Sequence, residues 1–102
     1  MTEGKIALSG FDVDEAEKAI LMNLIENYKH KILQKTEFEE ITLRLKKSQH
    51  GKAMLNEVQG KLVAEKMYNA KAEDYNLFSA IAEVLEKLIN EVMHNKRTRR
   101  QE

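Results

Sequence analysis

The sequence predicts an α+β domain with the element order β-α-β-β-β-α, in which a four-stranded mixed sheet carries two helices packed on one face. Two segments, residues 14–34 and 77–92, repeat their apolar side chains with the period of a helix, whereas three segments between them alternate with period two. No proline interrupts either pattern. At 102 residues the chain is long enough for one core. We expect residues 1–95 to form a single domain and residues 96–102 a basic flexible tail.

The first half of the chain predicts a strand followed by a helix. Residues 4–9 form a short apolar run that stops at Gly10 and reads as an opening strand. Asp14 can cap a helix that runs to about Gln34, with negative charge in its first turn. The buried stripe of this helix is predicted to contain Ala16, Ile20, Leu21, Leu24, Ile25, Tyr28 and Ile32.

Three further strands are predicted between the helices. Ile41, Leu43 and Leu45 alternate with polar residues from Glu40 onward, and residues 48–51 read as the following turn. Residues 56–64 alternate again, with Gly60 marking close packing or a bulge on the inward face. After a turn near residues 65–66, residues 68–73 form the last strand.

The second helix completes the predicted fold. Asp74 or Asn76 can cap it. Its apolar stripe consists of Leu77, Phe78, Ile81, Leu85, Leu88, Ile89 and Val92. The first two strands, joined through a helix, should pair in parallel, and the short later connections require antiparallel neighbours.

Charge is unevenly distributed although the net charge is zero. Residues 1–92 carry 13 basic and 16 acidic side chains, whereas the last ten residues carry four cations and one acid. A second basic run contains Arg44, Lys46, Lys47 and Lys52, with no acid between them, and reads as a loop. Both basic segments can neutralise phosphates of a nucleic acid, and both can equally be solvated surface.

Most enzymatic chemistry is excluded by the residue inventory. The chain has no cysteine, so thiolate nucleophiles and thiolate metal sites are absent. His30, His50 and His94 are too widely spaced for a local ligand pair and are expected at the surface. Tyr28, Tyr68 and Tyr75 can stack on bases, but their positions favour core packing. We expect no cofactor, no metal, no small-molecule substrate and no catalytic residue.

Location and membrane association follow from hydropathy. No window approaches the roughly 20 apolar residues that a membrane span requires, and no signal segment precedes the domain. We therefore expect a cytoplasmic protein without a membrane partner.

Several segments resemble a known family, the ribosome hibernation promoting factors and ribosome-associated inhibitors, also called sigma-54 modulation proteins, in their short form. Residues 6–13 resemble the opening strand of the family and the Gly-x-x-Val start of its first helix. Residues 40–43 and 58–63 resemble its second and third strands. Residues 70–81, followed by Glu86-Lys87-Leu88, are similar to its Ala-x-Ala and Asp-Lys-Leu stretch, which is the most specific match.

The resemblance implies a non-enzymatic regulator of translation in the stress response. Such proteins bind the decoding region of the small ribosomal subunit through basic residues on both helices and silence idle ribosomes. By position, Lys87 and Lys96 match basic sites of the second helix. The sequence departs from the family at residues 24–28, where a lysine-rich pattern is usual, and at Asn90 and Met93.

The candidate partner is therefore the small ribosomal subunit and its rRNA, bound by a monomer or weak homodimer. The candidate RNA-binding residues are Lys18, Lys29, Lys31, Lys35, Lys46, Lys47, Lys52, Lys87, Lys96, Arg97, Arg99 and Arg100. An alternative is a protein-interaction or assembly module of the same fold that does not bind RNA. A generic double-stranded-RNA binder is disfavoured because no lysine cluster opens the second helix.

Overall fold

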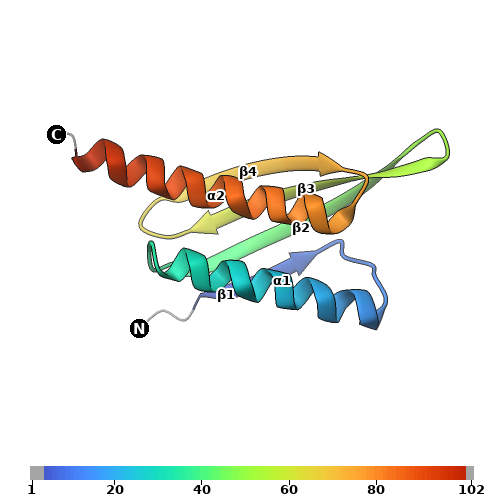
Figure 1. Cartoon of the computed structure of the whole chain (residues 1–102), viewed down its shortest axis with the longest axis horizontal. Coiled ribbons are helices and arrows are strands. Elements are labelled where there is room, and N and C mark those ends of the chain that lie inside the picture. Colours follow the sequence, from blue (N-terminus) through green and yellow to red (C-terminus); the bar gives the residue numbers. More distant parts are fainter. Residues whose placement is uncertain (1–3, 101–102) are drawn as a thin grey trace.

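The predicted order of elements is confirmed. The computed structural model describes the backbone of residues 4–100 and the side chains of residues 4–95. The elements are β1 (Lys5–Ser9), α1 (Glu15–Leu33), β2 (Glu40–His50), β3 (Ala53–Val63), β4 (Met67–Asp74) and α2 (Leu77–Arg100) (Figure 1). They form one four-stranded sheet in the order β1-β2-β3-β4. β1 pairs with β2 in parallel, and the other pairs are antiparallel, as the connections require.

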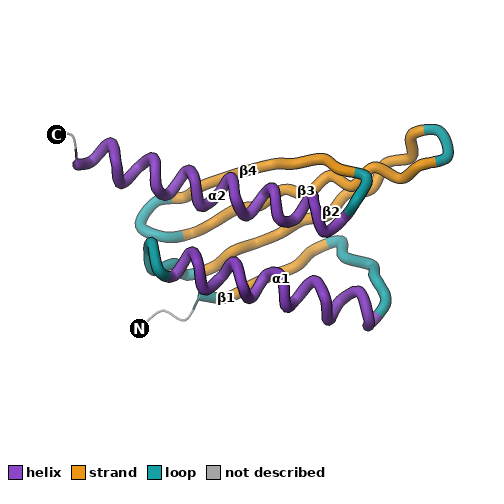
Figure 2. Tube along the Cα trace, viewed as in Figure 1, coloured by secondary structure: helices purple, strands orange, loops and turns teal. Residues whose placement is uncertain are grey.

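Both helices cover one face of the sheet and enclose the core. α1 runs along β1, and α2 runs along β3 and β4 (Figure 2). Inward residues of the strands alternate with exposed ones, so the opposite face is open to solvent. The fully buried core contains Leu21, Ile25, Ile41, Leu43, Val58, Leu62, Ala80, Ile81, Val84, Leu85 and Leu88.

The caps of both helices agree with the sequence, but the stripe of α1 is narrower than predicted. The Asp14 side chain accepts a hydrogen bond from the Glu17 N–H at 2.7 Å, and Asn76 caps α2 through the Ser79 N–H at 3.0 Å. The prediction that Ala16 and Ile20 are buried is wrong, and Ile20 is 56% exposed. Ile20 lies one residue, or about 100° around the helix, from the buried stripe.

Gly60 lies where α2 crosses β3. A Cβ atom at this position would collide with the Val84 side chain and would lie 3.2 Å from Leu88 Cδ1 and 3.3 Å from Leu43 Cδ2. The predicted close packing is therefore the role of this glycine, because the helix rests directly against its backbone.

The turn predicted at residues 48–51 is wrong. β2 and β3 remain paired as far as His50 and Ala53, and the two-residue loop is Gly51-Lys52. Gly51 has φ +65°, which the first central residue of a tight hairpin turn requires. The supposed basic loop at 44–52 is therefore mostly strand.

The paired ends of β2 and β3 extend beyond the rest of the sheet. β1 ends its pairing at Arg44 of β2, and β4 begins its pairing at Asn56 of β3. Residues 46–55, named here the hairpin arm, therefore protrude as a two-stranded ribbon past the helices (Figure 1). The arm contributes to an elongated shape of 51 × 27 × 17 Å.

The first part of the predicted tail, residues 96–100, continues α2. α2 extends to Arg100, beyond the predicted domain boundary at residue 95. The side chains of Lys96, Arg97, Arg99 and Arg100 lie outside the described part of the structure, as do residues 101–102 entirely. A flexible basic tail over residues 96–102 stays a prediction.

Candidate nucleic-acid interface

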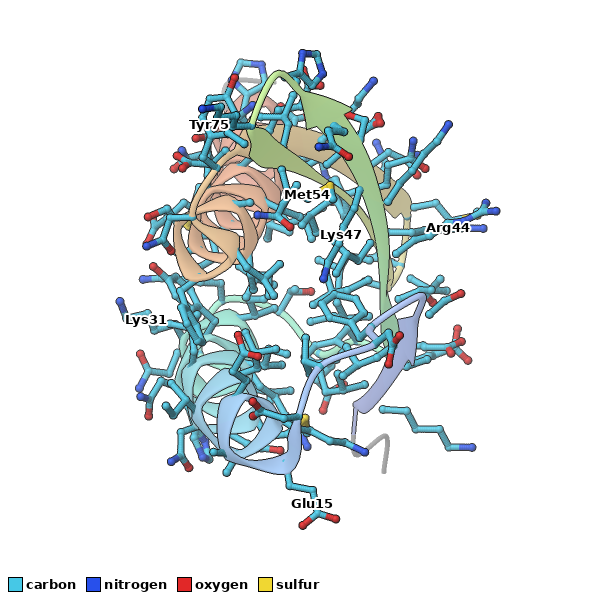
Figure 3. All side chains as sticks on the ribbon, turned by 90° about the vertical axis from the view of Figure 1, so that its right-hand side faces the viewer. Glu15, Lys31, Arg44, Lys47, Met54 and Tyr75 are labelled. Atoms are coloured by element: carbon cyan, nitrogen blue, oxygen red, sulfur yellow. The ribbon has the colours of Figure 1, made fainter. Side chains whose placement is uncertain are left out.

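The hairpin arm presents cations on both faces and at its tip. Lys46 and Lys47 are consecutive in β2, so they point to opposite faces of the ribbon, and Lys52 lies in the turn. All three side chains are exposed. Lys47 lies on the side that faces the helices, whereas Arg44 projects from the open face of the sheet (Figure 3). No acidic residue occurs from Arg44 to Asn56, so the arm carries positive charge only, and the nearest acid is Glu57, opposite Lys46 at the base of the arm.

The open face beside the arm contains a shallow depression of about 460 Å³. Arg44 and Lys46 line it together with Gln59 of β3 and Ser9 of β1. Further along the face, Lys71 pairs with Glu57 at 3.0 Å. This hydrogen bond and the negative charge of Glu57 raise the pKa of Lys71, so the ammonium stays protonated and already has a counterion. Arg44 and Lys46 thus give two cations to the end of the open face nearest the arm, and Lys61 adds a third further along β3.

The predicted cations of α1 are spread along the helix. Lys18 is exposed beside a small cavity of about 220 Å³ that Phe11 and Val13 help to line. Lys29 is half-buried, and Lys35 is exposed just after the helix. Lys31 projects away from the sheet, with its Nζ atom 4.8 Å from the centre of the Tyr28 ring (Figure 3). These lysines do not form one cluster with the arm.

The ammonium group of Lys87 already has partners within the protein. Its Nζ atom donates a hydrogen bond of 2.8 Å to the Lys71 carbonyl and lies 3.2 Å from the Glu83 carboxylate. Across the described side chains of the two helices, four lysines stand against six acids. Within this part of the chain the helix surface is not basic, whereas the arm carries Lys46, Lys47 and Lys52 and no acid.

A groove lies at the base of the arm, between the arm and the starts of both helices. Its volume is about 340 Å³. The lining residues are Val13, Glu17, Lys47, Met54, Asn56, Tyr75, Asn76, Leu77 and Phe78. Asn56 is buried, and its Nδ2 atom donates a hydrogen bond of 3.0 Å to the Tyr75 carbonyl. This bond ties the turn before α2 to β3.

Of the groove residues, only Lys47 was among the predicted RNA-binding residues, and the groove itself was not predicted. The prediction that Tyr75 packs in the core is wrong, because its side chain is 59% exposed. Tyr28 and Tyr68 are half-buried against the core, in agreement with the prediction. The position of Tyr75 next to a helix cap suggested that its side chain packs in the core. In the structure the side chain stays exposed at the base of the arm.

Tyr28 of α1 lies close enough to Glu86 of α2 for the carboxylate to affect its titration. Burial raises the pKa of Tyr28 above its usual 10.0, and a hydrogen bond to Glu86 and the charge of that carboxylate raise the pKa further. The phenol of Tyr28 therefore stays protonated at neutral pH.

Residues 4–95 contain no group of three or more His, Asp or Glu side chains placed to hold a metal ion. His30, His50 and His94 are exposed, as predicted. Within the same part of the chain, neither helix has the length and apolarity needed to cross a membrane.

Comparison with known proteins finds solved structures that have a similar fold. No family model matches the sequence, and no curated protein matches it significantly. Among solved structures, a ribosomal subunit interface protein from Coxiella burnetii is similar, with a TM-score of 0.66 and 19% identity over 91% of this chain and 98% of that chain. The N-terminal domain of Protein Y from Thermus thermophilus is similar with a TM-score of 0.52 and 19% identity over 89% and 93% of the two chains. The predicted fold is thus shared with a ribosomal subunit interface protein and with the N-terminal domain of Protein Y.

Proposed function

We propose that this chain is a non-enzymatic RNA-binding protein that associates with the small ribosomal subunit and silences idle ribosomes. The observation that carries the proposal is the hairpin arm, which presents Lys46, Lys47 and Lys52 with no acidic residue nearby in sequence. Contacts between such lysines and phosphates release counterions, which favours binding to RNA at moderate salt. The fold shared with a ribosomal subunit interface protein and with Protein Y supports the ribosome as the partner.

In this proposal the arm makes the main contact, and the helices contribute less than the family resemblance implies. Lys18, Lys29 and Lys31 supply further cations from α1, and Lys35 supplies one from the turn that follows it. Lys87 contributes less because Glu83 and a backbone carbonyl already bind it. Lys96, Arg97, Arg99 and Arg100 remain proposed contacts. The protein acts in the cytoplasm during stress, as a monomer or weak homodimer, without a cofactor.

The test is co-sedimentation with purified small ribosomal subunits over a series of salt concentrations. The double variant Lys47→Gln/Lys52→Gln removes two charges from the arm. Lys5→Gln/Lys61→Gln is the matched control, because it removes two exposed charges that make no ion pair with a described residue. We expect the arm variant to bind more weakly, with a salt slope reduced by about 1.5 to 2, and the control to follow wild type. Absence of wild-type binding at low salt would overturn the proposal.

A second candidate function is a protein-interaction module that retains the fold without binding RNA. Exposed apolar side chains favour it, as does the acidic excess on the described helix surfaces; the exposed side chains are Ile20, Met54, Met67 and Tyr75. Binding to a protein partner through apolar side chains depends only weakly on salt. Sedimentation with subunits that is unchanged between low and high salt would therefore favour this candidate over RNA binding.

A further inference from the structure

Tyr75 has an exposed aromatic side chain, and hydrogen bonds fix the backbone of the turn in which it lies. Its ring is 59% exposed, yet its carbonyl accepts the hydrogen bond from Asn56, which is only 6% exposed. The neighbouring residues fix the turn as well, because Asp74 Oδ1 accepts from the Asn76 N–H at 2.8 Å. A ring presented on a rigid backbone loses little conformational freedom when a ligand packs on it.

The surroundings of Tyr75 combine an apolar surface with a cation. Met54, which is 46% exposed, and Phe78, which is half-buried, line the same groove. Lys47 comes from the arm on the other side, and both Lys47 and Met54 lie on the helix-facing side of the ribbon (Figure 3). The groove volume of about 340 Å³ falls at the lower end of the range for small-ligand pockets.

We infer that this groove binds one unpaired nucleotide of an RNA strand, with the base stacked against Tyr75 and the adjacent phosphate on Lys47. The inference rests on the proposed function and specifies its ligand. An aromatic face can stack only on a base that its own strand leaves uncovered, so the groove selects single-stranded loops over duplex. Glu17, the one acid in the lining, can accept a hydrogen bond from an amino group of cytosine, adenine or guanine.

The charge of the surroundings favours RNA over a protein as the occupant. The RNA strand that would continue from the groove passes along the helix-facing side of the arm toward Lys52 at the tip, and acids are absent from Arg44 to Asn56. A polyanion is complementary to this path along its length. A protein partner would need a matching acidic segment in addition to its apolar anchor.

The experiment measures fluorescence anisotropy of labelled single-stranded RNA hexamers and of a blunt duplex with the same sequence at low salt. Wild type is expected to prefer the single strands. Tyr75→Ala should weaken single-strand binding about 5-fold to 150-fold, the effect of losing one base stack, and leave duplex binding unchanged. Tyr75→Phe keeps a stacking face and should bind at least several-fold more tightly than Tyr75→Ala. Met67→Ala truncates another exposed side chain, 58% exposed on β4, and serves as the control.

Co-sedimentation of the same variants with small subunits separates failure of this inference from failure of the proposed function. If wild type binds subunits but Tyr75→Ala binds single strands as tightly as wild type, the nucleotide groove is refuted and the arm remains an electrostatic contact. Equal affinity of wild type for single strands and duplex would also refute the nucleotide groove. If wild type binds neither RNA nor subunits, both proposals are overturned. Urea unfolding of Tyr75→Ala checks that its fold is retained.

Discussion

Individual lysines on this surface differ in how available their charge is to a partner. Lys71 and Lys87 each lie within 3.2 Å of a carboxylate of the same molecule. Lys47 and Lys52 are exposed and make no ion pair with a described residue. An ammonium that already has a counterion must lose that partner before it binds a phosphate. The sequence position of Lys87 therefore predicted a stronger RNA contact than its surroundings favour. Its ammonium group already has partners on β4 and on the previous turn of α2.

Gly60 allows a specific prediction about packing. Gly60→Ala should lower the free energy of unfolding by about 1 to 3 kcal/mol, because the new methyl group would collide with Val84. Val84→Ala alone should also destabilise by leaving a cavity. The double variant should lose less than the sum of the single losses, since each change relieves the other. Urea unfolding measures all four proteins, and additive losses would show that the helix does not press on this glycine.

At the scale of elements, the caps and the alternating strands were predictable because each depends on local sequence. Asp14 and Asn76 lie at helix starts, and Ile41, Leu43 and Leu45 alternate as a buried strand face does. The hairpin arm was not predictable in this way. Its residues are mostly exposed on both faces, so it shows no apolar alternation. Backbone pairing between two strands maintains it, and that pairing leaves no side-chain pattern. The one available signal was Gly51-Lys52, a two-residue hairpin loop.

The N-terminal cap of α1 leads to a second prediction, which concerns the stability of the fold. Asp14→Ala should lower the free energy of unfolding by about 1 kcal/mol, because the Glu17 N–H loses its acceptor. Asp14→Asn retains a side-chain oxygen and should recover most of this loss. Thermal or urea unfolding checks the order wild type, Asn, Ala. Equal stability of the Asn and Ala variants would contradict capping as the role of this side chain.

The contact between the helices predicts a dependence on alkaline pH. The pKa of Tyr28 is higher in the folded than in the unfolded state, so the folded protein holds this proton more tightly. The stability that it contributes is complete below about pH 10 and is lost as the pH rises through the folded-state pKa. Tyr28→Phe should therefore show a shallower fall in unfolding free energy above pH 10.

Glu86→Gln is the matched variant for this titration. It removes the negative charge that raises the pKa of Tyr28 and keeps a side-chain oxygen that can accept its hydrogen bond. Its alkaline loss of stability should lie between those of wild type and Tyr28→Phe. Identical pH profiles for wild type and Tyr28→Phe would show that this tyrosine does not couple the helices.

At the scale of the whole molecule, charge and topology point to different surfaces. The family resemblance places rRNA contacts on the helices, but in the part of the chain with described side chains the helices carry more acids than lysines. The sheet topology instead projects a basic ribbon from one end (Figure 1). The fold could be predicted because apolar periodicity encodes it. The candidate site could be predicted only as a set of cations, since their grouping depends on which strands extend beyond their neighbours.

The most direct test of this account compares the arm with α1 in binding to small ribosomal subunits. Lys47→Gln/Lys52→Gln and Lys29→Gln/Lys31→Gln remove the same charge from the two surfaces. The account predicts that the arm variant loses more affinity at every salt concentration and that its salt slope falls by about 1.5 to 2, whereas the α1 variant changes less. A larger loss in the α1 variant would contradict the account and return the interface to the helices.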